Sequence, residues 1–180
     1  MDCAVVGGIA VSFRSIERTT KDFDLAVAVT DDGQAEALVA SMSELGYRIG
    51  FVLESEVEGR LATVRLISGG EREIFIDLLF ASSGIEREVI ERANPIEIFP
   101  GLNVKVASRP ALIALKVLSA NFDTRPQDVI DLGNLIRSAS EDERSEAFDL
   151  VDVITARKYN RRKNLRADLE NYVKNVLSRK

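Results

Sequence analysis

The sequence contains no histidine, one cysteine and no tryptophan, and only four of its 180 residues are proline. Without histidine, the chain cannot build a Ser-His-Asp or Cys-His nucleophilic site or a histidine-ligated zinc centre. The single cysteine, Cys3, excludes an internal disulfide framework and any metal cluster held by several thiolates. Acid, base or metal chemistry in this protein therefore has to use carboxylates, with lysine and arginine as charge partners.

Long apolar runs are also missing. No segment approaches the roughly 18 apolar residues that a membrane span needs, and the opening Met-Asp-Cys has no basic flank typical of a signal peptide. We therefore expect no membrane partner and a cytoplasmic location, with which the single cysteine is consistent. A composition of 46% hydrophobic and 29% charged residues indicates an ordinary globular protein with a sizeable core.

The formal net charge of -5 is unevenly distributed along the chain. Residues 152–180 contain nine Lys or Arg against three Asp or Glu, and residues 1–151 contain fifteen against twenty-six. An acidic body with a basic tail favours a polyanionic partner, such as RNA, near the C-terminus. The alternative is that the basic residues form a solvent-exposed helix face. A run of basic residues taken alone is more often such a face than a binding site.

Hydrophobic periodicity predicts an α+β protein, with a mixed sheet and helices over residues 1–107 and a helical region packed on that core over residues 108–180. Ser68-Gly-Gly-Glu71 is a hairpin signal, and Thr124-Arg-Pro-Gln127 has the spacing of a capping box. The predicted strands are 4–6, 22–29, 47–53, 60–67 and 72–80, with extended segments in 96–106. The predicted helices are 9–15, 32–45, 85–93, 108–120, 124–138, one from 140, and one from 160 onward.

Gly7 and Gly8 stand where the first predicted strand runs into a helix. Bare backbone N–H groups at a positive helix terminus form a place where a phosphate can dock, since no side chain blocks its approach. A pair of glycines alone is more often a plain turn, so this interpretation depends on what lies nearby.

Three aspartates form the candidate site. Asp22 and Asp24 lie two apart on a predicted strand and share a face, where a divalent cation would relieve their repulsion. Asp77 lies in an apolar strand, where a carboxylate is costly to bury unless it meets a cation or several donors. Beside Gly7-Gly8, the three carboxylates match the needs of metal-assisted phosphoryl transfer. We expect them to converge there and, without metal, at least one to have a raised pKa.

These residues resemble a known family. Val6-Gly-Gly-Ile-Ala10 and Arg18-Thr-Thr-Lys-Asp-Phe-Asp24 are similar to the G-G-x-A … R-x-T-x-D-x-D signature of nucleotidyltransferases with the polymerase β-like fold. Ile76-Asp77-Leu78 resembles their third-carboxylate strand. The segments 109–116 and 125–132 resemble the A-x-x-L-x-x-K and R-x-x-D-x-x-D-L helices of the AbiEii group, toxins of type IV toxin–antitoxin pairs from abortive-infection systems. The resemblance spans residues 5 to about 135.

The resemblance implies a role for each matching residue. Asp22, Asp24 and Asp77 would bind Mg²⁺ or Mn²⁺ and form the catalytic set, with Asp77 also the base toward the acceptor hydroxyl. Gly7 and Gly8 would hold the triphosphate of an NTP.

The other residues that match the family motif each have a structural explanation as well. Lys116 would contact nucleotide phosphates and assist catalysis, with Asp128 nearby, but an ordinary salt bridge between helices explains this pair equally well. Arg18 and Thr20 fit the nucleotide-binding pattern and equally fit groups that anchor a loop.

The function that follows is transfer of a nucleoside monophosphate from an NTP to a hydroxyl, with an RNA end favoured as the acceptor, as in the tRNA-modifying toxins that the chain resembles. A cognate antitoxin is the further partner that the resemblance implies. Two alternatives stay open: a small molecule or protein side chain as the acceptor, or a catalytically silent module of the same fold that binds a nucleotide or a partner.

Overall fold

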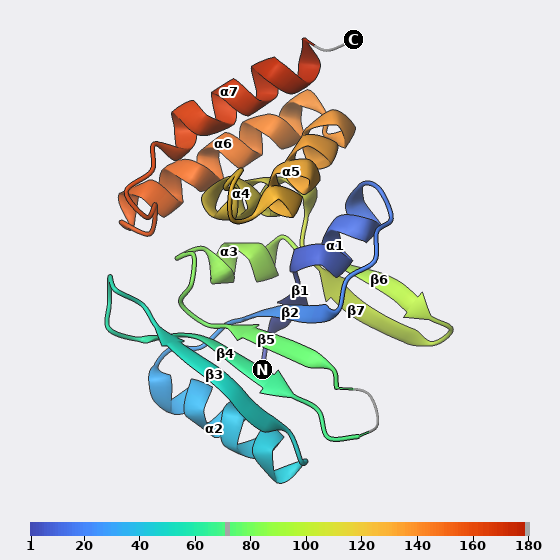
Figure 1. The fold of residues 1–180 in the computed structure, drawn as a ribbon, viewed down its shortest axis with the longest axis vertical. Coiled ribbons are helices and arrows are strands. Elements are labelled where there is room, and N and C mark those ends of the chain that lie inside the picture. The colour runs from blue at the N-terminus through green and yellow to red at the C-terminus, as the bar shows by residue number, and fades with distance from the viewer. Residues whose placement is uncertain (71–72, 179–180) are drawn as a thin grey trace.

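The computed structural model describes residues 1–70 and 73–178, and over these residues the chain forms one mixed seven-stranded sheet and seven helices (Figure 1). This confirms the predicted α+β class. The strands are β1 (Cys3–Val5), β2 (Asp22–Val27), β3 (Arg48–Glu54), β4 (Leu61–Ile67), β5 (Phe75–Leu79), β6 (Asn94–Phe99) and β7 (Leu102–Val106). The helices are α1 (Gly7–Arg14), α2 (Asp32–Glu44), α3 (Glu86–Glu91), α4 (Arg109–Ser119), α5 (Pro126–Ser138), α6 (Glu141–Ala156) and α7 (Leu165–Leu177).

The strands lie in the order β3-β4-β5-β2-β1-β7-β6. β2 runs parallel to β5 and antiparallel to β1, while β4 is antiparallel to both β3 and β5. β5 therefore lies inside the sheet between β4 and β2, as its apolar sequence predicts. This order brings the aspartates of β2 next to the aspartate of β5.

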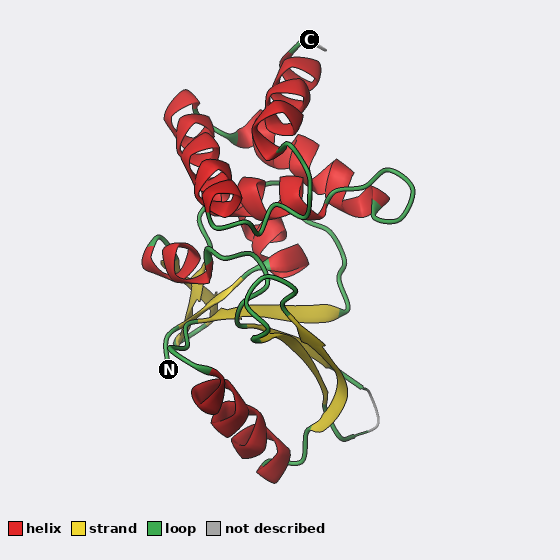
Figure 2. Ribbon diagram, turned by 90° about the vertical axis from the view of Figure 1, so that its left-hand side faces the viewer, coloured by secondary structure: helices red, strands yellow, loops and turns green. Residues whose placement is uncertain are grey.

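Helices cover both faces of the sheet. Figure 2 shows α2 against one side and α1, α3 and the bundle α4–α7 on the other. The larger hydrophobic core lies between the sheet and the bundle and includes Val5, Leu112, Leu132 and Leu150, whereas a smaller core under α2 includes Leu66. β7 ends at Val106 and α4 begins at Arg109, so the predicted boundary at residue 107 lies in the connection between them. Both parts contribute residues to one hydrophobic core, and their division into two domains stays a prediction.

Two helices are capped by the first residue of their predicted ranges. Ser108 accepts a hydrogen bond from the Ala111 N–H at the start of α4, and Ser140 and Glu143 form a full capping box on α6. The capping box predicted at Thr124 is wrong. Residues 121–125 form a turn instead, in which the Asn121 side chain accepts from the Thr124 N–H, and α5 has no side-chain cap.

The last helix begins later than predicted. It starts at Leu165, capped by Asn164, because Arg161 and Arg162 adopt positive φ angles of 52° and 60° that a right-handed helix cannot include. Arg72 of the predicted strand 72–80, Glu71 of the predicted hairpin turn, and Arg179 and Lys180 of the basic tail lie outside the described residues.

Among residues 1–70 and 73–178, no helix is both long enough and apolar enough to span a bilayer.

Candidate active site

The three aspartates converge as predicted. Asp24 in β2 lies directly opposite Asp77 in β5, and Asp22 lies two residues earlier on the same face of β2. Asp77 is buried, with 8% of its surface exposed. The parallel pairing of two short strands thus gathers three carboxylates from segments far apart in the sequence.

Gly7 and Gly8 place the first turn of α1 against this cluster. Gly7 has a φ of +62°, and a Cβ atom on it would lie 1.8 Å from Oδ2 of Asp24. A Cβ atom on Gly8 would lie 2.6 Å from the Arg18 guanidinium and 2.9 Å from Oγ1 of Thr20. No side chain caps α1, so the N–H groups of its first turn are free for another acceptor. The predicted docking place for a phosphate therefore adjoins the predicted metal ligands.

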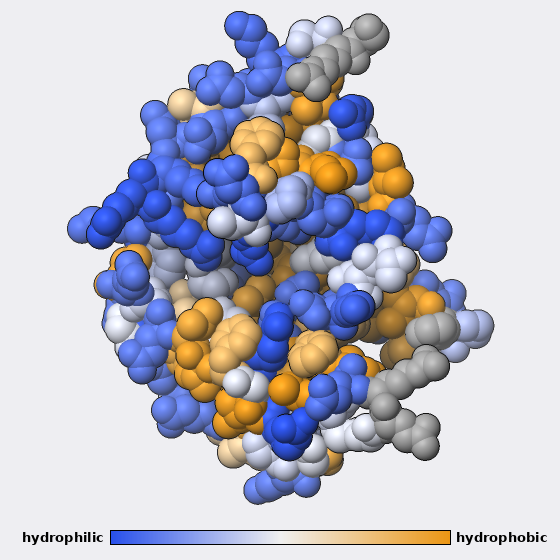
Figure 3. All heavy atoms as spheres, viewed as in Figure 1, coloured by the Kyte–Doolittle hydropathy of each residue, from blue (hydrophilic) through white to orange (hydrophobic). Residues whose placement is uncertain are grey.

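A cavity of about 750 Å³ opens between the sheet and the helices α4 and α5. The space-filling view shows the surface hollowed between the helical part above and the sheet below (Figure 3). The cavity is lined by every residue that the sequence predicts for the site: Gly7, Gly8, Arg18, Thr20, Asp22, Asp24, Asp77, Lys116 and Asp128. The structure brings all of them together, and their individual roles stay predictions.

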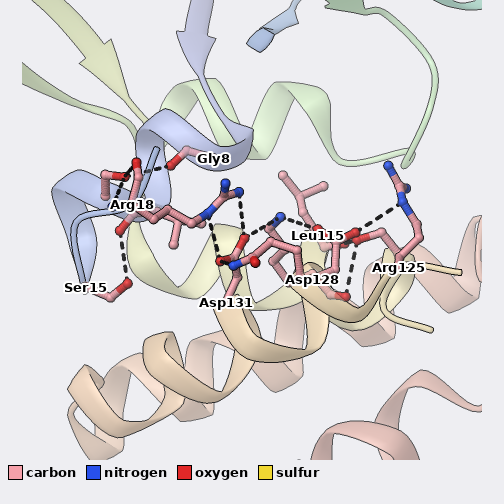
Figure 4. A network of polar contacts seen from close by, with 12 residues as sticks. Gly8, Ser15, Arg18, Leu115, Arg125, Asp128 and Asp131 are labelled. Carbon is pink, nitrogen blue, oxygen red and sulfur yellow. Dashed lines mark hydrogen bonds and ion pairs between the residues drawn. The ribbon is translucent and has the colours of Figure 1, made fainter. Parts of the chain in front are cut away.

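A chain of ion pairs connects the helical bundle to the loop that precedes β2 (Figure 4). Lys116 of α4 donates to Asp128 and lies 3.0 Å from Oδ2 of Asp131, both on α5. Arg18 donates to the same Asp131 oxygen at 3.0 Å. Burial raises the pKa of Asp128, but the charge and the hydrogen bond of Lys116 outweigh it, and the net pKa is lowered. The salt bridge between Lys116 and Asp128 does form, and Lys116 also faces the cavity.

Asp131 lies behind the cavity lining and contacts two residues of the site, and sequence reasoning did not assign it a role. It is fully buried, and it accepts from Arg18 and from Gln127 at 2.9 Å while it faces Lys116. A buried carboxylate between two cations fixes both of them, because either one unpaired in that position would be costly. A signal was present: Asp128 and Asp131 are three apart and share one face of α5.

Arg65 of β4 is the second residue that sequence reasoning missed. Its guanidinium donates two hydrogen bonds to Asp77, at 2.7 and 2.6 Å, and a third to Asp22 at 3.2 Å. These bonds raise the pKa of Arg65 further above its usual range. A cation in a mostly apolar strand, opposite an acid in the next strand, was the available signal.

The pKa of Asp24 is raised above its ordinary range, as predicted for at least one carboxylate of the cluster. Burial is the largest cause, followed by the negative charge of Asp77, while Lys116 works in the opposite direction. The prediction rested on repulsion between carboxylates, which is a smaller cause here than burial.

The donor set fits a divalent cation in part. As the side chains stand, no group of three acidic residues in the described part of the chain is placed to share a metal ion. Both oxygens of Asp77 are engaged by Arg65. Asp22 and Asp24 present hard oxygen donors on one face, and Mg²⁺ is commonly held by one or two carboxylates together with substrate phosphates. The pair therefore suits a cation that arrives with a triphosphate.

Solved structures show which fold this is. The chain is similar to an antigenic nucleotidyltransferase-like protein from Paracoccidioides brasiliensis, with a TM-score of 0.50 and 18% identity over 94% of this chain and 84% of that one. It is also similar to the antibiotic-resistance factor ANT(2″)-Ia, with a TM-score of 0.52 and 19% identity over 97% and 88%. The mixed sheet with its helical part is thus a nucleotidyltransferase fold. Among curated proteins, none matches the sequence.

The family follows from the sequence match over nearly the whole chain. Residues 1–179 match the family described as nucleotidyl transferase AbiEii toxin, Type IV TA system, and the chain belongs to that family. The resemblance drawn from the glycine, aspartate and lysine motifs is thereby confirmed.

Proposed function

We propose that the protein is a metal-dependent nucleotidyltransferase that moves a nucleoside monophosphate from an NTP to a hydroxyl group and releases pyrophosphate. The observation that carries the proposal is one cavity in which the open first turn of α1, the carboxylates of β2 and β5, and Lys116 face one another. Anion-binding backbone, cation-binding oxygens and a positive side chain are the parts that phosphoryl transfer requires.

The residues divide the work by position. Gly7 and Gly8 would hold the triphosphate at the N-terminus of α1, and Asp22 and Asp24 would hold Mg²⁺ or Mn²⁺. The cation supplies positive charge for the developing negative charge when it is bound. Asp77 accepts the proton of the acceptor hydroxyl as that oxygen bonds to the α-phosphorus and the bond to the bridging oxygen breaks. Lys116 stabilises the phosphate charge from the side of α4.

An RNA end is the acceptor that we favour, with the 3′ end of tRNA as the first candidate. Arg161 lines the nucleotide cavity and also a neighbouring cavity of about 660 Å³, which Lys158 and Arg162 line as well. Three cations in one turn beside the reaction centre can neutralise the phosphates of a polynucleotide that enters there. Membership of a toxin family supports a cognate antitoxin as the protein partner and the cytoplasm as the location.

The test is incubation of the protein with total tRNA, Mg²⁺ and each of the four NTPs labelled at the α-phosphate. Label should enter RNA with the wild type and with Asp149→Asn, an exposed aspartate of α6, but with neither Asp22→Ala nor Asp77→Ala. Label in protein would move the acceptor to a side chain, and label in an added small alcohol would move it to a metabolite. No label in any fraction would favour the catalytically silent module.

A further inference from the structure

Arg65 joins two of the three site carboxylates through a single guanidinium. It lies in β4 directly opposite Asp77 in β5, and both Asp77 oxygens accept from it, at 2.7 and 2.6 Å. The nitrogen that bonds Asp77 at 2.6 Å also donates to Oδ2 of Asp22 at 3.2 Å. The parallel two-pronged contact with Asp77 is one that arginine can make and lysine cannot.

Aromatic rings hold this guanidinium in place. It lies 5.1 Å from the ring centre of Phe51 in β3 and 5.5 Å from that of Phe75 in β5. Cation–π contacts of this length are favourable, and they restrict the side chain to the position where it meets Asp77. Three neighbouring strands therefore combine to keep a positive charge within the carboxylate cluster.

We propose that Arg65 is the internal counter-cation of this site, a positioning residue that holds Asp77 and keeps free divalent cations from binding tightly before the NTP arrives. A metal ion that approaches the cluster meets a positive charge already bonded to Asp77 and Asp22. Fewer carboxylate oxygens are then free to bind the ion, and the cluster attracts it less strongly. A triphosphate brings several negative charges and additional oxygens, which restore that attraction. Asp24, whose carboxylate lies against Gly7, is then the ligand that receives the metal with the nucleotide.

Metal binding without catalysis tests this directly. The inference rests on the proposed function, because a divalent cation is taken to bind at Asp22 and Asp24. Free Mn²⁺ is measured by electron paramagnetic resonance during titration of the wild type, Arg65→Gln and Arg65→Lys, each without nucleotide. Loss of a unit charge a few ångströms from the metal should tighten Mn²⁺ binding on the order of tenfold in Arg65→Gln. Arg65→Lys keeps the charge and should bind Mn²⁺ as the wild type does, while its kcat falls because it cannot grip both oxygens of Asp77.

Arg48→Gln is the matched control. Arg48 lies on the neighbouring strand β3 and its exposed side chain pairs with Glu73 at 2.8 Å, so the variant removes the same net charge away from the aspartates. It should leave the Mn²⁺ affinity unchanged. Adding Asp77→Asn to Arg65→Gln should return the affinity toward the wild-type value, because the uncompensated carboxylate is then gone.

A second measurement uses the wild type alone and does not depend on the folding of any variant. Its Mn²⁺ affinity should rise at least about tenfold in the presence of a non-hydrolysable NTP, after the Mn²⁺ that the nucleotide binds without protein has been subtracted. Equal affinity with and without the nucleotide, or an Arg65→Gln variant that binds Mn²⁺ no more tightly than the wild type, overturns the inference. If Arg65→Gln binds Mn²⁺ more tightly but the wild type labels no acceptor, the counter-cation stands and the proposed transfer reaction fails.

Discussion

Gly7 lies so close to Asp24 that a methyl group on it would sit 1.8 Å from the carboxylate oxygen Oδ2. The φ of +62° adds strain for any other residue. We therefore expect Gly7→Ala to lower the free energy of unfolding by about 2 kcal/mol or more, through backbone strain and displacement of Asp24 together. Nucleotide transfer should be lost with it. Urea denaturation followed by circular dichroism measures the stability change.

Gly59 separates the two causes. Its φ of +63° is nearly the same as that of Gly7, but a Cβ atom there meets no other atom within 4 Å. Gly59→Ala should cost about 1 kcal/mol, from the backbone alone, and should retain activity. Equal losses of stability in the two alanine variants would show that the contact with Asp24 contributes nothing.

The raised pKa of Asp24 makes stability depend on pH. A carboxyl group whose pKa is higher in the folded chain binds more protons when folded, so the free energy of unfolding falls as pH rises from about 4 through the raised folded value. Asp24→Asn removes this loss. Without metal, we expect the variant to melt at the same temperature as the wild type or higher at neutral pH, and to show a smaller decrease between acidic and neutral pH.

Asp31 provides the opposite sign on the same chain. The hydrogen bond from the Gln34 N–H lowers the pKa of Asp31, so its contribution is present above the ordinary aspartate range and is lost as pH falls. Asp31→Asn should therefore lose less stability than the wild type on acidification.

For Asp24, the contradicting outcome is a decrease in the free energy of unfolding with rising pH that persists unchanged in Asp24→Asn. That result would assign the titration to another group.

Asp131 should be far more important for stability than its surface counterpart. Asp131→Asn leaves Arg18 and Lys116 facing a neutral group in a buried position, and we expect a loss of about 3 kcal/mol in the free energy of unfolding. Asp152 pairs with Arg166 at 2.8 Å, but both side chains are about half exposed. Asp152→Asn should cost less than about 1 kcal/mol. Denaturation of the two variants side by side measures both changes. Similar losses of stability would contradict the importance of the buried ion pairs that Asp131 makes with Arg18 and Lys116.

Metal and nucleotide together should stabilise the folded chain. Ligands that bind only the native state raise the free energy of unfolding, by about 2.7 kcal/mol when the ligand concentration is one hundred times the dissociation constant. The melting temperature rises with it. Millimolar Mg²⁺ with the preferred NTP should therefore raise the melting temperature of the wild type and leave that of Asp22→Ala nearly unchanged. A thermal-shift titration with each of the four NTPs measures this. A wild-type melting temperature that does not change with Mg²⁺ and any of the four NTPs would contradict the metal site.

Much of the fold could be predicted from local patterns. Period-two alternation located the strand of Asp22 and Asp24, helical spacing and the cap residues Ser108 and Ser140 located two helices, and a charged residue amid apolar neighbours singled out Asp77. These signals depend on contacts within a few residues, so they are readable from the chain itself. The failures were local competitions: the Asn121 turn displaced the expected cap at Thr124, and a left-handed turn delayed the last helix to Leu165.

The identities of the site's catalytic candidates came from the sequence, but their charge balance came from the tertiary structure. The position of Arg65 opposite Asp77 depends on the register of β4 against β5, and a shift of one residue would turn Arg65 to the other face of the sheet. The burial of Asp131 depends on how α5 packs against α4 and on the path of the loop that carries Arg18. The sequence by itself determined which residues could do this chemistry. Tertiary packing decided which cation each carboxylate meets, because those partners lie on separate elements whose registry no local pattern specifies.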